Sequence, residues 1–144
     1  MLKDAPDHLD ADLILKLYDL RREQSLREAR ELLTKEFWPK SAKEAVAVLS
    51  LDHPLNRAYR QVSTYWEMVY RMARHGIIHG DFLVENNAEG LLLYARVEPY
   101  LVEIRAASSA RSFQSAEWVA TEVPMGRTIA EHMRARVKKA LGGK

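Results

Sequence analysis

Four side chains of metal-binding type lie close together in the middle of the sequence: His75, His79, Asp81 and Glu85. Imidazole and carboxylate groups can hold an ion that activates water for hydrolysis. Two histidines at positions i and i+4 bind one ion when they share a helix face. We expect Gly76 to end the helix between the two histidines and turn them apart. We therefore favour surface histidines near a helix end, and keep a small metal-dependent hydrolase or transferase as the alternative.

The segment from His79 to Asn86 also matches the H-G-D-x-x-x-x-N catalytic loop of aminoglycoside-phosphotransferase-like kinases. In that loop the aspartate, here Asp81, accepts the hydroxyl proton, and the asparagine holds a metal ion. Kinases of this type also need a glycine-rich strand turn and a second metal-binding aspartate shortly downstream. No strand-turn-strand pattern precedes His79, and no aspartate lies between Asn86 and Arg105. We therefore predict that Asp81 caps a helix after the sharp entry that Gly80 permits.

The last predicted helix, Arg127 to Leu141, is the most basic segment of the chain, with Arg127, Arg134 and Lys138 on one stripe. Such cations can bind the phosphates of a nucleic acid. No helix-turn-helix or other nucleic-acid-binding signature accompanies them. Cations near a helix C-terminus also complement the helix dipole. We therefore expect a solvated face here, and keep nucleic-acid binding as a second alternative.

Composition narrows the function classes further. The chain has 144 residues, 47% hydrophobic and 29% charged, which is typical of one globular domain. Its formal net charge of +2 does not by itself indicate a polyanionic partner. The absence of cysteine excludes disulfides, thiolate nucleophiles and cysteine-ligated metal sites. The sequence lacks a secretory signal and a membrane-spanning segment, so we expect a cytoplasmic protein without a cofactor.

The elements that position these residues are helices, because apolar residues recur at spacings of three and four and strand patterns are nearly absent. The clearest helix runs from Leu55 to Ala73, with Gly76 as its C-cap. A short connection then leads to a second helix that opens at Asp81 and ends near Ala88. The sequence thus predicts a central helix-loop-helix.

Other helices follow from capping and breaking residues. We expect Asp10 or Asp12 to cap the first helix, which bends or restarts near Arg22 to Ser25, where Ser25 and Glu28 form a capping-box pattern. A further helix from Leu91 to Ala107 should kink or break at Glu98, because Pro99 removes a backbone donor. Shorter helices are predicted from Ser41 to Leu49 and from Phe113 to Thr121.

Several short motifs resemble a family of uncharacterised bacterial all-helical domains. They are the first-helix segment Tyr18–Arg22, the helix end at His75-Gly76-Ile77-Ile78, the opening at Asp81-Phe82-Leu83, Pro99-Tyr100 before Ile104-Arg105, and the pair Glu117-Trp118. The resemblance covers most of the chain and implies an all-helical fold. The family has no assigned activity, so the resemblance implies no catalytic residue.

These observations lead to one interpretation. We expect an all-α, irregular bundle of about five to seven helices in a single domain over residues 1–144, with residues 1–9 and 142–144 frayed. With no catalytic set identified, we favour a non-enzymatic protein-interaction or structural module. Its expected partner is a second copy or another protein, and a membrane is excluded.

Overall fold

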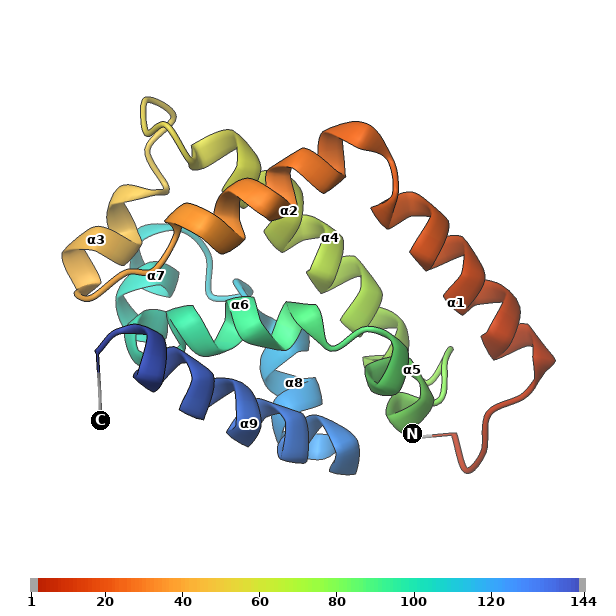
Figure 1. The fold of residues 1–144 in the computed structure, drawn as a ribbon. Coiled ribbons are helices and arrows are strands. Elements are labelled where there is room, and N and C mark those ends of the chain that lie inside the picture. Colours follow the sequence, from red (N-terminus) through yellow and green to blue (C-terminus); the bar gives the residue numbers. More distant parts are fainter. Residues whose placement is uncertain (1–2, 143–144) are drawn as a thin grey trace.

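The computed structural model describes residues 3–142, and these residues are helical with no strand (Figure 1). The all-α prediction is confirmed, but the helices outnumber the five to seven expected. In chain order they are α1 His8–Arg21, α2 Gln24–Glu36, α3 Ala42–Ala47, α4 Asn56–Arg74, α5 Gly80–Asn86, α6 Glu89–Val97, the 3₁₀ helix η1 Glu98–Tyr100, α7 Leu101–Ala107, α8 Gln114–Glu122 and α9 Pro124–Ala140.

The N-terminal helices begin at residues that differ from the predicted caps. Asp7 caps α1 by accepting from the amides of Leu9 and Asp10. The carboxylate of Asp10 in turn accepts from the amide of Asp7. Asp10 is thus the third residue of the helix and Asp12 the fifth, so neither is the N-cap that we predicted. His8 and Leu9, which we expected to fray, form the first turn. The other predicted frayed ends include residues 1–2 and 143–144, which lie outside the described residues.

The predicted restart near Arg22 to Ser25 is confirmed as a break between α1 and α2. Its cap is Glu23, whose carboxylate accepts from the amides of Ser25 and Leu26 at 3.0 Å each. The Ser25–Glu28 capping box is therefore wrong. A glutamate just before the helix supplies two acceptor oxygens, which leaves Ser25 free to bond Gln61 of α4.

The predicted break at Pro99 is also confirmed. α6 ends at Val97, Pro99 lies in the short helix η1, and α7 restarts at Leu101. The last helix begins at Pro124, earlier than the predicted Arg127. Proline suits this first position because an N–H group there would have no acceptor within the helix, so its absence costs nothing.

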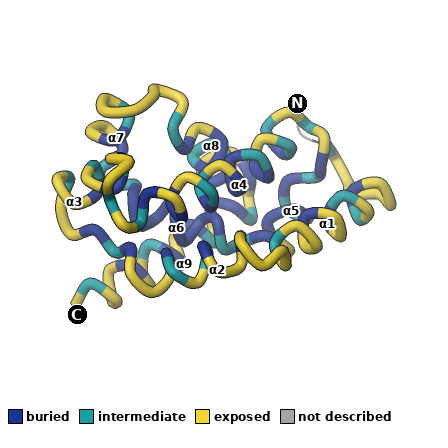
Figure 2. Tube along the Cα trace, turned by 90° about the horizontal axis from the view of Figure 1, so that it is seen from above, coloured by how far each residue is buried: buried dark blue, intermediate teal, exposed yellow. Residues whose placement is uncertain are grey.

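α6 is the buried centre of the domain. All its residues from Gly90 to Val97 are buried, as expected of a helix with neighbours on all sides. Figure 1 shows α6 between α2 and α9, with α4 and α8 behind it, and Figure 2 shows the buried residues concentrated along α4, α6 and α8. Every α-helix contributes at least one apolar side chain to the same core.

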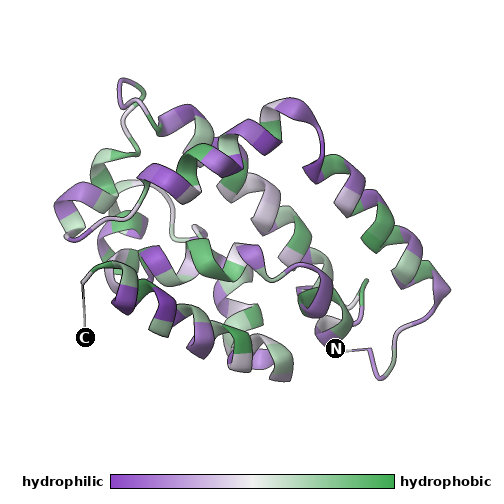
Figure 3. Cartoon of the chain, in the orientation of Figure 1, coloured by the Kyte–Doolittle hydropathy of each residue, from purple (hydrophilic) through white to green (hydrophobic). Residues whose placement is uncertain are grey.

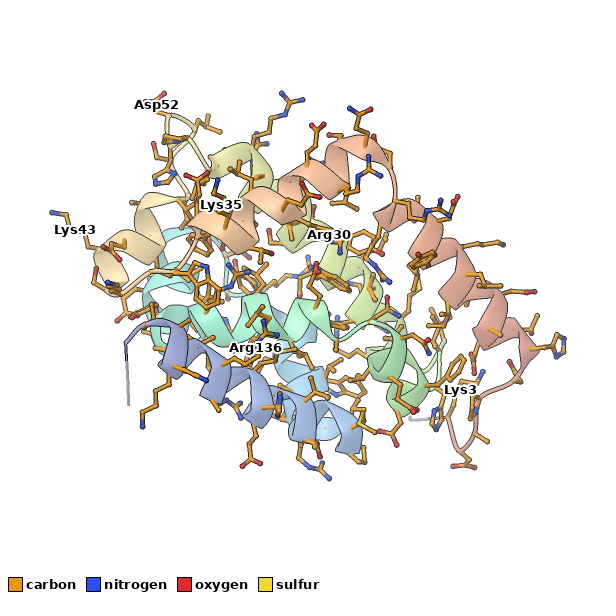
Figure 4. All side chains as sticks on the ribbon, in the orientation of Figure 1. Lys3, Arg30, Lys35, Lys43, Asp52 and Arg136 are labelled. Carbon is orange, nitrogen blue, oxygen red and sulfur yellow. The ribbon has the colours of Figure 1, made fainter. Side chains whose placement is uncertain are left out.

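Charged side chains join α6 to α2. Arg30 of α2 donates to Glu89 of α6 at 2.7 and 2.8 Å, and Figure 4 shows Arg30 between the two helices. At the other end, buried Arg96 donates to the carbonyls of Leu33 and Phe37 at 2.7 and 2.6 Å. Burial lowers the pKa of Arg96 to about 10, so the guanidinium remains charged at neutral pH. It therefore caps the C-terminus of α2, where the helix dipole favours a cation.

α1 lies at the edge of the bundle. Asp10, Ile14 and Leu17 face inward, and most of its other residues are exposed (Figure 2). Hydrophobic residues nevertheless recur along the whole helix (Figure 3). Among the described residues, no helix combines the length and the apolar character needed to cross a membrane.

α8 and α9 approach each other closely at Gly126. A Cβ atom added there would lie 2.1 Å from the carbonyl oxygen of Val119, a backbone atom of α8. The two helices could not keep this separation with any side chain at position 126.

We expect Gly126→Ala to lower the free energy of unfolding by about 1–3 kcal/mol, because the added methyl group forces α8 and α9 apart. This loss should exceed the gain of up to about 1 kcal/mol in helix propensity. Urea denaturation would measure it, with Thr128→Ala on the exposed side of α9 as the control. A variant at least as stable as the unchanged protein would contradict the close packing.

Candidate functional site

The two histidines of the helix-loop-helix occupy different helix ends. His75 follows α4 as its exposed C-cap residue, and Gly76 adopts a left-handed φ of 73°. His79 caps α5, because its Nδ1 atom accepts from the amide of Phe82 at 3.1 Å. The imidazole nitrogen that accepts this bond is thereby occupied. The predicted loop is confirmed, and it separates the histidines by a change of chain direction.

Asp81 is not the cap of its own helix. It is the second residue of α5, and its Oδ1 atom accepts from the amide of Met125 at 2.8 Å. Met125 is the second residue of α9, whose own N-cap residue, Val123, has no side-chain acceptor. The prediction erred because His79 already caps α5, which leaves the Asp81 carboxylate available to cap another helix.

Glu85 is exposed and forms no hydrogen bond or ion pair with the described residues. Over residues 3–142, no three histidine, aspartate or glutamate side chains come together in a way that could hold a metal ion. The four candidates therefore have separate positions: a C-cap, an N-cap, a cap for α9 and an exposed carboxylate.

The residues that match the kinase catalytic-loop motif belong to α5 or cap it. Asn86, which would hold a metal ion in a kinase loop, donates to the carbonyl of Phe82 at 2.9 Å within α5. The segment from Gly80 to Asn86 is a continuous helix, whereas a catalytic loop must direct aspartate and asparagine from an irregular backbone toward one phosphate.

The basic stripe of α9 is partly paired. Arg134 donates to both oxygens of Glu98 at 2.7 and 2.9 Å, and this interaction raises the pKa of Arg134. Arg127 donates to the carbonyl of Thr121 at 3.2 Å, and Lys138 is exposed. Arg134 thus links α9 to η1, and the stripe does not present three free cations to a phosphate backbone.

A cavity of about 310 Å³ beside α4 was not predicted from the sequence. Its walls come from α4, from Leu49 shortly after α3 and from the loop between α7 and α8. The lining residues combine an apolar floor, hydroxyl groups, two arginines and one carboxylate: Leu49, Tyr59, Ser63, Thr64, Glu67, Arg71, Ser108, Arg111, Ser112 and Phe113.

Glu67 holds the start of α8 in place beside this cavity. Glu67 is 9% exposed, and its carboxylate accepts from the amides of Ser115 and Ala116 at 2.9 and 2.8 Å. These amides belong to the first turn of α8, which has no side-chain cap of its own. Phe113, just before α8, has a left-handed φ of 59°, which is uncommon for a bulky residue. The carboxylate of α4 thus caps α8 across the domain.

One sequence signal points to this cavity. Ser63, Glu67 and Arg71 are spaced by four residues and so share one face of α4, beside its apolar stripe. The signal shows a polar face but not what lies opposite. The loop from Ser108 to Phe113 reaches the cavity only through the tertiary fold.

We expect Glu67→Ala to lower the free energy of unfolding by about 3–5 kcal/mol, because it leaves two buried amides without acceptors. Glu67→Gln should cost about half as much, since one oxygen remains and an NH₂ group opposes the second amide. Thermal and urea unfolding would measure both, with exposed Glu103→Gln as the control. Losses below about 1 kcal/mol for both variants would contradict the cap.

We expect Asp81→Ala to cost about 1 kcal/mol of stability, because it removes the acceptor that caps α9. Asp81→Asn keeps an acceptor oxygen and should change stability little. Urea unfolding would compare the two, with Glu85→Ala on the exposed side of α5 as the control. Equal losses for asparagine and alanine would show that the hydrogen bond does not hold α9.

No curated protein and no solved structure matches the chain. One family model matches residues 6–123, from just before α1 to the end of α8. The chain therefore belongs to the family described as "Domain of unknown function (DUF4760)".

Proposed function

We propose that this domain is a non-enzymatic protein-interaction module that pairs with a second copy of itself through α1. The observation that carries the proposal is the exposure of apolar side chains on this helix. Of the seven large hydrophobic side chains exposed among residues 3–142, four lie on α1. Leu9 and Leu20 share one side of the helix, and Leu15 and Tyr18 lie on another side. Exposed apolar groups gathered on one element are typical of a protein-binding surface.

The spacing on α1 favours a second helix as the occupant. Leu9, Leu13, Lys16 and Leu20 follow one another at steps of four, three and four residues. This is the spacing of a short coiled-coil seam, which we call the α1 seam. Leu9 and Leu20 are 59% and 50% exposed, and Leu13 is half-buried. A seam that spans most of α1 can pack against an identical seam.

The charges on α1 favour an antiparallel pair. If Leu9 faces Leu20 of the other copy, Lys16 lies beside Asp12 of that copy. The twofold symmetry repeats this contact between opposite charges, so it forms twice in the dimer. A parallel pair would place Lys16 against Lys16. Antiparallel pairing about a twofold axis also gives a closed dimer, because the same surface is used on both subunits.

The size of the α1 seam predicts a weak dimer. Burying the exposed half of each leucine contributes on the order of 1 kcal/mol. Association itself costs at least about 4 kcal/mol in lost translational and rotational freedom. The two contributions are of similar size, so we expect a weak dimer that forms only at high protein concentration. The absence of cysteine supports the cytoplasm as the compartment where this pairing occurs.

Sedimentation equilibrium at concentrations that extend to the millimolar range tests the proposal. The unchanged protein should dimerise, and Leu9→Gln with Leu20→Gln should be monomeric with little change in thermal stability. The matched control is Leu51→Gln with Val102→Gln, which removes two exposed hydrophobic side chains elsewhere. A monomer at all concentrations, or equal weakening by both pairs of substitutions, would overturn the proposal.

A charge exchange tests the orientation of the two copies. Lys16→Asp alone should weaken the dimer, because it places aspartate beside Asp12 of the other copy. Adding Asp12→Lys should restore dimerisation, because the opposite charges again meet across the seam. Failure of the double variant to recover any association would contradict the antiparallel arrangement.

A further inference from the structure

The cavity beside α4 is lined by two exposed arginines that form no ion pair with the described residues. Arg71 of α4 and Arg111 of the α7–α8 loop both line it, and the ion pairs found among residues 3–142 involve neither. They come from segments far apart in the sequence. The fold therefore brings two uncompensated guanidinium groups to one small cavity.

The floor of the cavity holds an unused hydrogen-bonding group. Tyr59 is only 5% exposed, and its hydroxyl forms no hydrogen bond with any residue from 3 to 142. The hydroxyl oxygen retains contact with solvent, because the fully buried side-chain nitrogen or oxygen without a partner among residues 3–142 belongs to Arg96. Burial raises the pKa of Tyr59, so the hydroxyl remains protonated at neutral pH and can donate. Tyr65, Tyr70 and Tyr94, in contrast, all have hydrogen-bond partners.

Next to this hydroxyl the floor is apolar. The rings of Tyr59 and Phe113 meet edge to face with 6.3 Å between their centres, and Leu49 also lines the cavity. Such a surface accepts the hydrocarbon part of a ligand. The rim adds hydroxyl groups, including Ser108 and Ser112, whose oxygens lie 3.0 Å apart.

The charge around the cavity selects an anion. Glu67 is the one acidic residue that lines it, and both of its oxygens already accept amides of α8. Two guanidinium groups therefore face a single carboxylate that is already hydrogen-bonded. A cation would meet repulsion here, and an anion would gain charge-assisted hydrogen bonds.

We propose that this cavity binds a small organic anion, with its carboxylate or phosphate at Arg71 and Arg111 and its apolar body against Tyr59 and Phe113. The volume of about 310 Å³ lies at the lower end of small-molecule sites, which excludes a nucleic-acid strand or a folded partner as the occupant. The Tyr59 hydroxyl donates to the anionic group or to an oxygen next to it.

Phenyl phosphate is a suitable probe because it combines a doubly anionic group with an aromatic ring. Titration of the full chain, followed by NMR shifts of backbone amides and by calorimetry, should give saturable binding with shifts at Ser108 to Phe113. Inorganic phosphate supplies only the anionic group of the probe, and phenol supplies only its aromatic ring. Both should bind at least about tenfold more weakly, a factor that corresponds to about 1.4 kcal/mol.

Matched variants locate the binding. Arg71→Gln and Arg111→Gln should each weaken phenyl phosphate about tenfold, the effect of losing one charge-assisted hydrogen bond. Replacing the exposed Arg27 of α2 in the variant Arg27→Gln changes the net charge equally and should leave the affinity unchanged. Tyr59→Phe keeps the ring and should weaken binding severalfold without lowering the melting temperature.

Three outcomes would overturn the proposal. The first is the absence of a saturable response to phenyl phosphate at millimolar concentrations. The second is equal weakening by Arg27→Gln, which would indicate attraction by net charge alone. The third is amide shifts confined to other surfaces. The melting temperature of each variant, measured beside its affinity, separates loss of a ligand contact from loss of the fold.

Discussion

Charged side chains that cap helix ends from other helices hold this bundle in one arrangement. Glu67 of α4 caps the start of α8, Asp81 of α5 caps the start of α9, and Arg96 of α6 caps the end of α2. Apolar burial supplies most of the folding free energy, but it is non-directional. A cap joins one side chain to a specific turn of another helix, so it fixes orientation as well as contact. Glu67 is central because it holds two amides in the first turn of α8, a helix whose own N-cap residue supplies no side-chain hydrogen bond.

The same constraint shapes the candidate binding cavity. Glu67 holds the first turn of α8, and Phe113 just before that turn forms part of the cavity floor. The Arg111 side of the cavity therefore depends on the cap that joins α4 to α8. The exposed leucines of α1 lie on a different element, at the edge of the bundle. The two proposed surfaces rest on separate observations, so either can fail without affecting the other.

Local sequence signals predicted the helices and most of their breaks. The spacing along α4, the left-handed Gly76 and the break at Pro99 depend on neighbouring residues, and all three appear in the structure. The predicted caps at Asp10, Ser25 and Asp81 were wrong because another side chain accepts from the first-turn amides. These side chains are Asp7, Glu23 and His79. Asp81 shows the reason clearly, since its partner, Met125, is distant in the sequence and only the fold brings them together. The cavity was missed for the same reason, because Tyr59 and Arg111 meet only in the folded chain.

Amide hydrogen exchange at Ser115 and Ala116 tests the central role of the Glu67 cap most directly. These amides open a helix and have no acceptor within it, so any protection must come from the carboxylate of Glu67. The account predicts that both exchange as slowly as amides in the middle of α4, through global unfolding. The amides of Ser25 and Leu26, capped by Glu23 at an exposed helix start, should exchange much faster. Exchange of Ser115 and Ala116 at that faster rate would contradict the account.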